Sequence, residues 1–353
     1  MVIDYLVIGQ GIAGTCLAYT LKKKGYSVLI INQIEECNSS EVAAGIFNPI
    51  TGKRCVKTWM APTLFPYAKE FYKEIEKTIG VQILYERDIL KVFGSQEQQT
   101  DLLVKSNDAH YVDYVDLRIN EEALTPVLNI PHGAVGILKG GWCNTKRFIE
   151  SSRDFFKSNN TYREELFVPS LLEISTDAVT YKDVTAKAII LCQGHHAIQN
   201  ELMNWLPFSV TKGEMLVIKA PSLPQDRIIN KNIFLLPKGD HEFLVGASFD
   251  RKIDKLLTEG GKAYVIEKLD ALLNVDYTIV DHVVGIRPTV RDRRPFIGRH
   301  PNYKNVYIFN GLGAKGVSLA PYFANELVDN ITTNKELNKE VNISRYYSLY
   351  SGQ

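Results

Sequence analysis

The first thirty residues combine apolar runs with one glycine-rich run. Residues 2–8 are mostly apolar, and residues 9–14 read Gly-Gln-Gly-Ile-Ala-Gly. An apolar helix is expected from Thr15 to Lys24, followed after Gly25 by a second apolar strand up to residue 31. The order strand, glycines, helix and strand predicts a βαβ unit that binds the phosphates of a nucleotide.

The three glycines of this run have separate roles in such a unit. Gly9 permits a tight turn after the strand, Gly11 lets the backbone approach a pyrophosphate, and Gly14 lets the helix pack closely on the strand. The helix N-terminus then directs free N–H groups and positive potential at the phosphates. We therefore expect cofactor contacts from the run as a whole, namely Gly9, Gly11, Ile12, Ala13 and Gly14.

The residue expected to bind the ribose is unusual in this chain. An acidic side chain about twenty positions after the glycines commonly fills that role. Here the position holds Asn32. An amide accepts one hydrogen bond and donates another, so Asn32 is expected to contact the ribose, and Glu35 or Glu36 just beyond the strand is the alternative.

Apolar spacing and turn residues predict further elements along the chain. In the first half we expect a helix over 64–79 that ends before Gly80, strands within 81–94, a less regular stretch over 101–136, a helix from Asn144 or Thr145 to about Lys157, and several strands between 168 and 192. Residues 188–192 are apolar on both faces, as in a central parallel strand.

In the second half we expect strands at 232–237 and 242–249 with a turn at 238–240 between them, a helix over about 260–273, a strand at 306–309 and a helix that ends near residue 331. The last strand and helix are joined by a second glycine-rich turn. This turn predicts that the chain returns late to the nucleotide.

The composition is that of an ordinary globular protein. With 353 residues, 45% of them hydrophobic, the chain is long enough for two lobes, and a net charge of +1 gives no general attraction to nucleic acid or anionic membrane. No run of about eighteen apolar residues predicts a membrane span. The five cysteines include no CxxC pair, which indicates reduced structural thiols in a cytoplasmic protein without a cleaved signal peptide.

Four further motifs accompany the first one. They are Ser-Ser-Glu-Val-Ala-Ala-Gly-Ile-Phe-Asn-Pro at 39–49, Ala-Ile-Ile-Leu-Cys-Gln-Gly at 188–194, a GxRP motif followed by Asp-Arg-Arg-Pro-Phe-Ile-Gly within 285–298, and Asn-Gly-Leu-Gly-Ala-Lys-Gly at 310–316. With these motifs the whole chain resembles the FAD-dependent oxidoreductases of the D-amino-acid oxidase superfamily. That family includes glycine oxidase, sarcosine oxidase and the FAD-dependent oxidase half of the bifunctional tRNA wobble-uridine modification enzyme.

The resemblance implies an FAD cofactor held along these motifs. In the family, the small-residue loop passes the pyrophosphate and the flavin ring, the strand that ends in glycine lies by the adenosine half, and the last loop lies against the N1 and C2 carbonyl edge of the flavin. The residues implied in this way are Ser39, Ser40, Ala43, Ala44, Gly45, Cys192, Gly194, Gly311, Gly313, Ala314, Lys315 and Gly316. Non-covalent attachment is expected, because the histidines begin only at His110 and no cysteine follows Cys192.

Three basic residues are the candidates for catalysis. In amino-acid-oxidising relatives the arginine of the GxRP motif grips the substrate carboxylate, which implies that role for Arg287, and a guanidinium group suits bidentate binding. Lys315 would stabilise the negative charge of the reduced flavin, or else point to solvent. Lys212 would promote oxygen reduction above the flavin, as the resemblance to sarcosine oxidase implies, or else be a turn residue.

Two further observations restrict the chemistry. Phe234 stands where glycine oxidase-like relatives often have a tyrosine that helps bind the carboxylate, which argues against a plain glycine-like substrate. His195 and His196 follow a strand with no carboxylate or cysteine at ligand spacing. We therefore expect these histidines to be loop residues, and we expect no metal site.

The resemblance implies an enzyme that oxidises a C–N bond of an amino acid or an N-substituted glycine. Hydride transfer from the substrate Cα–H to flavin N5 would give an imine that water hydrolyses, and oxygen or another acceptor would reoxidise the flavin. Carboxymethylaminomethyl-uridine in tRNA is the alternative substrate, less favoured because the chain lacks the methyltransferase half and a broad positive charge. A non-catalytic or electron-relay flavoprotein and an NAD-dependent dehydrogenase are the remaining alternatives.

The expected fold is α/β with two lobes. A Rossmann-like FAD-binding domain of the glutathione-reductase type would be joined by a second, mostly antiparallel β-sheet domain that binds a small amino-acid-like substrate. We expect the FAD domain to be discontinuous, with residues 1–85, 142–210 and 285–353. The substrate domain would comprise residues 86–141 and 211–284. The sequence does not indicate an oligomeric state.

Overall fold

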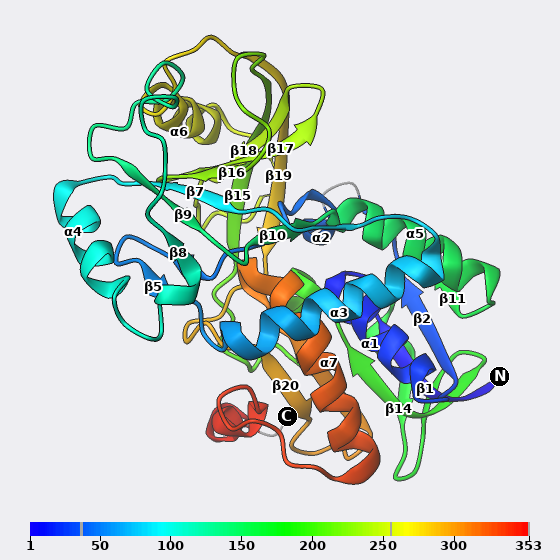
Figure 1. The fold of residues 1–353 in the computed structure, drawn as a ribbon. Helices are drawn as coiled ribbons and strands as arrows, with labels where there is room; N and C mark the ends of the chain where they lie inside the picture. The colour runs from blue at the N-terminus through cyan, green and yellow to red at the C-terminus, as the bar shows by residue number, and fades with distance from the viewer. Residues whose placement is uncertain (36–37, 255, 352–353) are drawn as a thin grey trace.

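The protein folds into two lobes, each built on one large β-sheet (Figure 1). The computed structural model describes residues 1–35, 38–254 and 256–351. The lobe in the lower half of Figure 1 contains both chain termini, and the upper lobe is built from internal segments. The expected α/β architecture with a second sheet is confirmed. Among the helices of the described residues, none has the length and apolar character needed to cross a membrane.

The first sheet is centred on β1 (Val2–Ile8), which pairs in parallel with β2 (Val28–Asn32) and β14 (Val184–Leu191). Its other strands are β11 (Tyr162–Glu164) beside β2, β13 (Val179–Tyr181) and β12 (Leu172–Ile174) beyond the start of β14, β21 (Val306–Asn310) beside the end of β14, and β20 (Phe296–Arg299) outside β21. The end of β14 has parallel neighbours on both sides, which confirms the predicted central strand.

Apolar helices pack against this sheet. α1 (Ile12–Lys23) contacts α7 (Gly316–Thr333), which in turn contacts α3 (Ala61–Ile79), and side chains of all three helices join β1 and β14 in one hydrophobic core. α3 ends at Gly80, whose φ of 71° is a left-handed conformation that favours glycine. The helix and its stop were both predicted.

α5 (Thr145–Ser158) shows how a local signal sets a helix start. The side chain of Asn144 accepts a hydrogen bond from the backbone N–H of Arg147 at 3.2 Å, which satisfies a donor that the first turn leaves free. The helix expected from Asn144 or Thr145 to about Lys157 is therefore confirmed.

The second sheet is mostly antiparallel. Its strands follow the order β19 (Thr278–Arg287), β15 (Thr211–Lys219), β18 (Glu242–Gly246), β17 (Phe234–Gly239), β16 (Ile228–Asn230), β7 (Ile89–Val92), β9 (Ala134–Ile137) and β8 (Val115–Asp116). The pair β16 and β7 is parallel, and it joins two segments that are far apart in the sequence. α6 (Glu259–Asp270) packs on β15.

The remaining elements are short. They are α2 (Ser39–Val42), α4 (Gln96–Lys105), a sheet of β3 (Ile46–Phe47), β10 (Gly141–Cys143) and β6 (Leu84–Tyr85), the hairpin of β4 (Ile50–Thr51) and β5 (Val56–Lys57), and 3-10 helices at Val112–Tyr114, Pro169–Leu171, Gly194–Gln199, Gly313–Lys315 and Ile343–Leu349. The stretch over 101–136 is irregular as expected, with the end of α4 and two short strands.

The second glycine-rich turn lies against the first one. A methyl group at Gly316 would be 2.9 Å from Cγ2 of Ile12, so the start of α7 touches the start of α1. The predicted late return of the chain to the first motif is therefore observed. The domain boundaries given above stay a prediction.

Candidate active site

The glycine turn after β1 has a backbone conformation and a crowded position that both require glycine. Gly9 has φ 98°, a left-handed conformation, and a methyl group there would lie 2.6 Å from the carbonyl oxygen of Cys192. A methyl group at Gly14 would lie 1.9 Å from the carbonyl oxygen of Gly9. Gly14 thus lets α1 pack directly behind the turn, and within the described chain it lines neither of the two cavities introduced below.

Asn32 links the glycine turn to the end of β2. Its Oδ1 accepts a hydrogen bond from the backbone N–H of Gln10 at 2.8 Å, and its Nδ2 donates to the hydroxyl of Tyr162 at 3.3 Å. Asn32 and Glu35 both line the first cavity, and Glu36 lies outside the described residues. The residue that would contact a ribose therefore stays a prediction.

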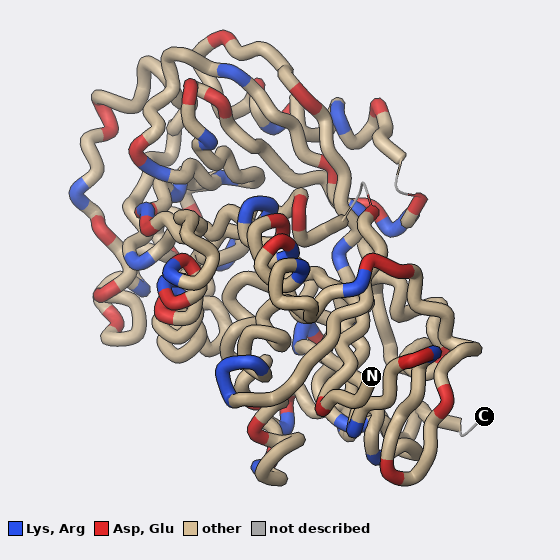
Figure 2. The backbone as a smooth tube through the Cα atoms, turned by 90° about the vertical axis from the view of Figure 1, so that its right-hand side faces the viewer, with Lys and Arg blue, Asp and Glu red and all other residues tan. Residues whose placement is uncertain are grey.

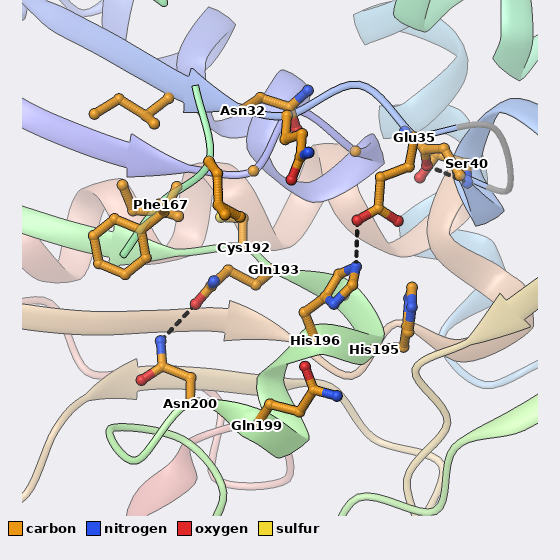
Figure 3. A pocket seen from close by; sticks show the side chains of 18 of the residues that line it. Asn32, Glu35, Ser40, Phe167, Cys192, Gln193, His195, His196, Gln199 and Asn200 are labelled. Atoms are coloured by element: carbon orange, nitrogen blue, oxygen red, sulfur yellow. Dashed lines mark hydrogen bonds and ion pairs between the residues drawn. The ribbon is translucent and has the colours of Figure 1, made fainter. Parts of the chain in front are cut away.

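A first cavity of about 310 Å³ lies at the carboxyl ends of β1, β2 and β14, the position where α/β sheets bind nucleotides (Figure 3). The predicted cofactor residues that line it are Gly9, Gly11, Asn32, Ser39, Ser40, Cys192 and Gly194. Burial raises the pKa of the Cys192 thiol, so its sulfur stays protonated and has little nucleophilic character.

His195 and His196 also line this cavity, from the 3-10 helix Gly194–Gln199. Nε2 of His196 lies 2.8 Å from Oε1 of Glu35, and Figure 3 shows the Glu35 side chain directed at that ring. One donor atom from each of the three residues falls within 4.8 Å of the others. No carboxylate stands at ligand spacing in the sequence, but the fold brings Glu35 to the histidines from the loop after β2. The expectation of no metal site stays a prediction.

A second cavity of about 420 Å³ lies next to the first, and the two share Gly11, Ser39, Ser40, Cys192 and Gly194. It extends from the glycine turns of the first sheet to the inner face of the second sheet. The predicted site residues that line it are Gly11, Ile12, Ala13, Ser39, Ser40, Ala43, Ala44, Gly45, Cys192, Gly194, Arg287, Gly313, Ala314 and Gly316. All five sequence motifs thus meet along one elongated surface.

Arg287 places a positive charge in the second cavity. It ends β19, and its guanidinium group lies over Gly213 of β15, where a methyl group would be 1.8 Å from Nη2. Burial lowers the pKa of Arg287, yet an arginine remains charged at neutral pH. Across residues 1–35, 38–254 and 256–351 no carboxylate forms an ion pair with it.

The structure does not bring Lys212 to the cavity. Successive side chains of a strand point to opposite faces, and in β15 the cavity is lined by Gly213 and Met215. Lys212 therefore points away from the cavity, and its buried Nζ lies 2.8 Å from Oδ1 of Asp254. This placement does not support a catalytic role above the flavin. The alternative of a turn residue is wrong, because Lys212 lies within a strand.

Lys315 and Gly311 lie beside the second cavity, and neither is among the described residues that line it. Lys315 is exposed at the N-terminus of α7, and its role toward the flavin or toward solvent stays a prediction. Gly311 has φ 72°, and a methyl group there would lie 3.0 Å from Cγ1 of Val290. It shapes the turn that carries Gly313 and Ala314.

Sequence reasoning missed much of the wall that the second sheet contributes. That wall contains Met215, Ala247, Ser248 and Phe249. The strand expected over 242–249 ends at Gly246, and the residues after it stay hydrogen-bonded to β15 while they reach the cavity. Phe234, singled out because it lacks a hydroxyl group, does line the cavity.

Comparison with known proteins relates this chain to FAD-dependent oxidoreductases, in agreement with cavities at a nucleotide-binding position. The family model described as "DAO: FAD dependent oxidoreductase" matches residues 4–330. The chain is 25% identical to the "Uncharacterized oxidoreductase YurR" of Bacillus subtilis, over 92% of this chain and 93% of that protein. It is 23% identical to the glycine oxidase of Geobacillus kaustophilus, over 94% of this chain and 93% of that protein.

A third relative is the tRNA 5-methylaminomethyl-2-thiouridine biosynthesis bifunctional protein MnmC of Legionella pneumophila, at 22% identity. The alignment covers 96% of this chain and 54% of that protein, so the chain spans about half of its length. Among solved structures, glycine oxidase from Bacillus cereus matches with a TM-score of 0.79 and 18% identity, over 95% of this chain and 96% of that chain. This likeness shows a shared fold.

The residues present fit an FAD molecule. Two adjoining cavities with a glycine-lined boundary provide an elongated space, as a dinucleotide requires. Gly11 faces that boundary without a side chain, and Ser40 Oγ accepts a hydrogen bond from the first helical N–H, that of Ile12, at 2.9 Å. The second cavity offers small residues from two loops, which suits close approach of a flat ring.

Proposed function

Because this chain belongs to the DAO family of FAD-dependent oxidoreductases, we propose that it oxidises the C–N bond of an amino acid or an N-substituted glycine. FAD, when bound, accepts the two electrons of that oxidation. Gly9, Gly11 and the start of α1 would hold its pyrophosphate, and Ala43, Ala44, Gly45 and Gly313 would border its ring. The glycine oxidase of Geobacillus kaustophilus supports an amine substrate by its similarity to this chain.

One observation supports a carboxylate on the substrate most directly. Among the described residues that line the second cavity, Arg287 alone is charged. A partly buried guanidinium group without an anionic partner is unfavourable, and a bound carboxylate would supply two acceptors in the geometry of its paired N–H groups. Arg287 would therefore bind and orient the substrate, which favours reaction by proximity.

The cavity offers little acid–base chemistry. No histidine, aspartate or glutamate is found among the described residues that line it. The substrate amine would therefore enter the reaction in its neutral form, because no side chain of this wall is available to take up its proton. Water would then hydrolyse the imine product. The electron acceptor, whether oxygen or another compound, is not indicated by the cavity.

Similarity to MnmC makes a tRNA-borne amine the second candidate, since the match covers nearly the whole chain. Charge distribution weighs against it. Figure 2 shows Lys and Arg interspersed with Asp and Glu along the backbone on this side of the molecule, and the net charge is +1. Nucleic-acid binding is commonly accompanied by a broad basic surface.

The proposal is tested with the visible spectrum of FAD-loaded protein during anaerobic titration. A panel of amino acids and N-alkyl glycines forms one arm, and a total tRNA fraction forms the other. Bleaching of the flavin bands by a small amine is the expected result. Bleaching by tRNA alone would replace the small substrate with the second candidate, and absence of flavin bands after reconstitution would contradict the flavoenzyme assignment.

A further inference from the structure

A buried cluster of charged residues lies behind the strand that carries Gly213. Lys212 and Glu214 are fully or almost fully buried, at 0% and 1% exposure. Lys212 Nζ lies 2.8 Å from Oδ1 of Asp254 and 3.4 Å from Oε1 of Glu214. Glu214 Oε2 lies 2.9 Å from Nε2 of His282 on β19. The cluster is thus one buried cation set between two carboxylates, with an imidazole at one edge and the exposed Lys252 3.1 Å from Oδ2 of Asp254 at the other.

The cluster binds the chain segment that follows β18, here called the 248–258 segment for its described residues. Glu214 accepts hydrogen bonds from the backbone N–H of Thr258 at 2.9 Å and from its hydroxyl at 2.7 Å. Lys212 Nζ donates to the carbonyl oxygen of Leu256 at 3.0 Å as well as to Asp254. The far part of the segment is therefore tied to β15 through two buried side chains.

Backbone bonds fix the near part of the segment to the same strand. Ser248 N–H donates to the carbonyl oxygen of Glu214 and Ser248 Oγ accepts from its N–H, both at 2.9 Å. Lys212 and Asp250 exchange backbone hydrogen bonds at 2.8 and 3.0 Å. Lys212 and Glu214 thus hold the segment at both ends. Their backbone groups bind its near part, and their side chains bind its far part.

The protonation states of the cluster agree with a permanent ionic tie. Burial would raise the pKa of Glu214, but hydrogen bonds from Thr258 and the charge of Lys212 outweigh it and lower that pKa. Burial would likewise lower the pKa of Lys212, but Asp254 and Glu214 raise it. A methyl group at Gly261 would touch the Glu214 carboxylate, which places that anion at the N-terminus of α6.

The start of this segment forms part of the wall of the second cavity. Ser248 and Phe249 of the segment line it, together with the preceding Ala247 and with Met215. Phe249 is 67% exposed, which is unusual for a large apolar side chain placed at the edge of a cavity. An apolar ring in that place gains burial when an apolar group enters the cavity.

We propose that Lys212, Glu214 and Asp254 are positioning residues that hold residues 247–249 as a fixed wall of the substrate cavity, with Ala247 and Phe249 as its apolar side chains. The wall would contact the substrate part that lies away from the carboxylate bound by Arg287, and would favour substrates with an apolar group there. This inference rests on the proposed function. It also gives Lys212 a role that does not involve contact with the cofactor.

Two variants test the ion pair between Lys212 and Asp254, one at each partner. Asp254→Ala removes the partner on the segment, where the side chain is 20% exposed, and Lys212→Met removes the buried cation. Lys91→Met is the control, because Lys91 is also a buried lysine of the same sheet, at 4% exposure, and its Nζ contacts Asn230 and Lys231 instead. All three are compared with the parent protein as FAD-loaded enzyme.

The first readout is limited trypsin cleavage after Arg251 and Lys252, which are exposed in the segment. Both test variants should be cut there about tenfold faster than the parent protein, since local opening follows the loss of buried ties. The control should be cut at the parent rate. This readout needs no substrate, so it stays informative if the proposed function fails. Unchanged cleavage in Asp254→Ala and Lys212→Met would overturn the proposal.

The second readout is anaerobic flavin reduction by whichever amine reduces the parent protein. We expect the half-saturating amine concentration to rise about tenfold in the test variants, with the limiting reduction rate and the FAD content near those of the parent, because binding loses a wall and the chemistry does not. Faster cleavage with unchanged half-saturation would show a merely structural tie and overturn the proposal. A parent protein that no amine reduces would contradict the proposed function instead.

Discussion

Phe234 presents an apolar ring to the second cavity at a place where a tyrosine would add a hydroxyl group. The variant Phe234→Tyr introduces one hydrogen-bond donor at a place in the wall that is apolar in the parent protein. A hydrogen bond to a charged group contributes about 1.5–3 kcal/mol, so we expect the half-saturating concentration of glycine to fall by about tenfold. Anaerobic flavin reduction measures it, and an unchanged value would show that the ring does not face the carboxylate.

The surroundings of His300 predict how the stability of the protein depends on pH. It is 1% exposed, lies against Tyr303, and its Nδ1 accepts a hydrogen bond from the backbone N–H of Asn302 at 3.2 Å. Burial lowers the pKa of His300 from 6.5 to about 4. The unfolded chain therefore binds a proton between these pH values that the folded protein does not bind.

Stability should consequently fall as the pH drops below 6.5. Each pH unit removes about 1.4 kcal/mol while the folded imidazole stays neutral, so between pH 7.5 and pH 5 this group lowers the free energy of unfolding by about 2 kcal/mol. Urea unfolding at the two pH values measures the change. His300→Gln keeps an acceptor for Asn302 and should reduce the pH dependence by that amount, and an equal dependence in the variant would contradict the account.

Single residues also show what the sequence could and could not predict. The role proposed for Arg287 came from its motif, and the fold places it in a cavity. The expected catalytic Lys212 faces the wrong side of its strand. Strand alternation follows from sequence, but which of two faces meets the cavity depends on pairing with β18 and β19. Glu35 meets His196 only through tertiary structure.

At the scale of elements, close packing of α1 on the glycine turn is the critical feature. In Gly14→Ala the added methyl group would lie 1.9 Å from the carbonyl oxygen of Gly9 and 3.3 Å from Cγ1 of Val7. The helix must move, and overpacking of this kind costs about 1–3 kcal/mol. We expect a lower thermal unfolding midpoint and weaker FAD binding, measured by flavin fluorescence.

Gly260→Ala is the matched control for that substitution. Gly260 lies in the first turn of α6, and apart from its chain neighbours and the backbone of its own helix no atom lies within 4 Å of an added methyl group. Alanine is the better helix former by about 1 kcal/mol, so the midpoint should stay the same or rise slightly. Equal losses in the two variants would show that packing behind the turn is not the cause.

Local signals predicted most elements of the first sheet. The turn at Gly9, the stop at Gly80 and the cap at Asn144 each act within a few residues. The second sheet was predicted as strands without an order. Its parallel pair β16 and β7 joins segments that lie far apart in the chain, and hydrophobic alternation alone does not specify such a partner.

For the whole molecule, the account predicts an FAD that is held without a covalent bond. The cavities offer Cys192 as a protonated thiol, and the two histidines lie in the first cavity and not in the second. Precipitation with acid should therefore release all flavin into the supernatant, where its spectrum measures it. A pellet that stays yellow would contradict this expectation.

The central claim is that Arg287 holds the carboxylate of an amine substrate in the second cavity. Its most direct test is anaerobic flavin reduction in the parent protein and in Arg287→Lys, with a reactive amino acid and with the amine that lacks its carboxylate. We predict that the parent reacts far better with the carboxylate compound. In Arg287→Lys its half-saturating concentration should rise at least about tenfold, because lysine lacks the paired donors. Equal reaction with both compounds, in both proteins, would contradict the account.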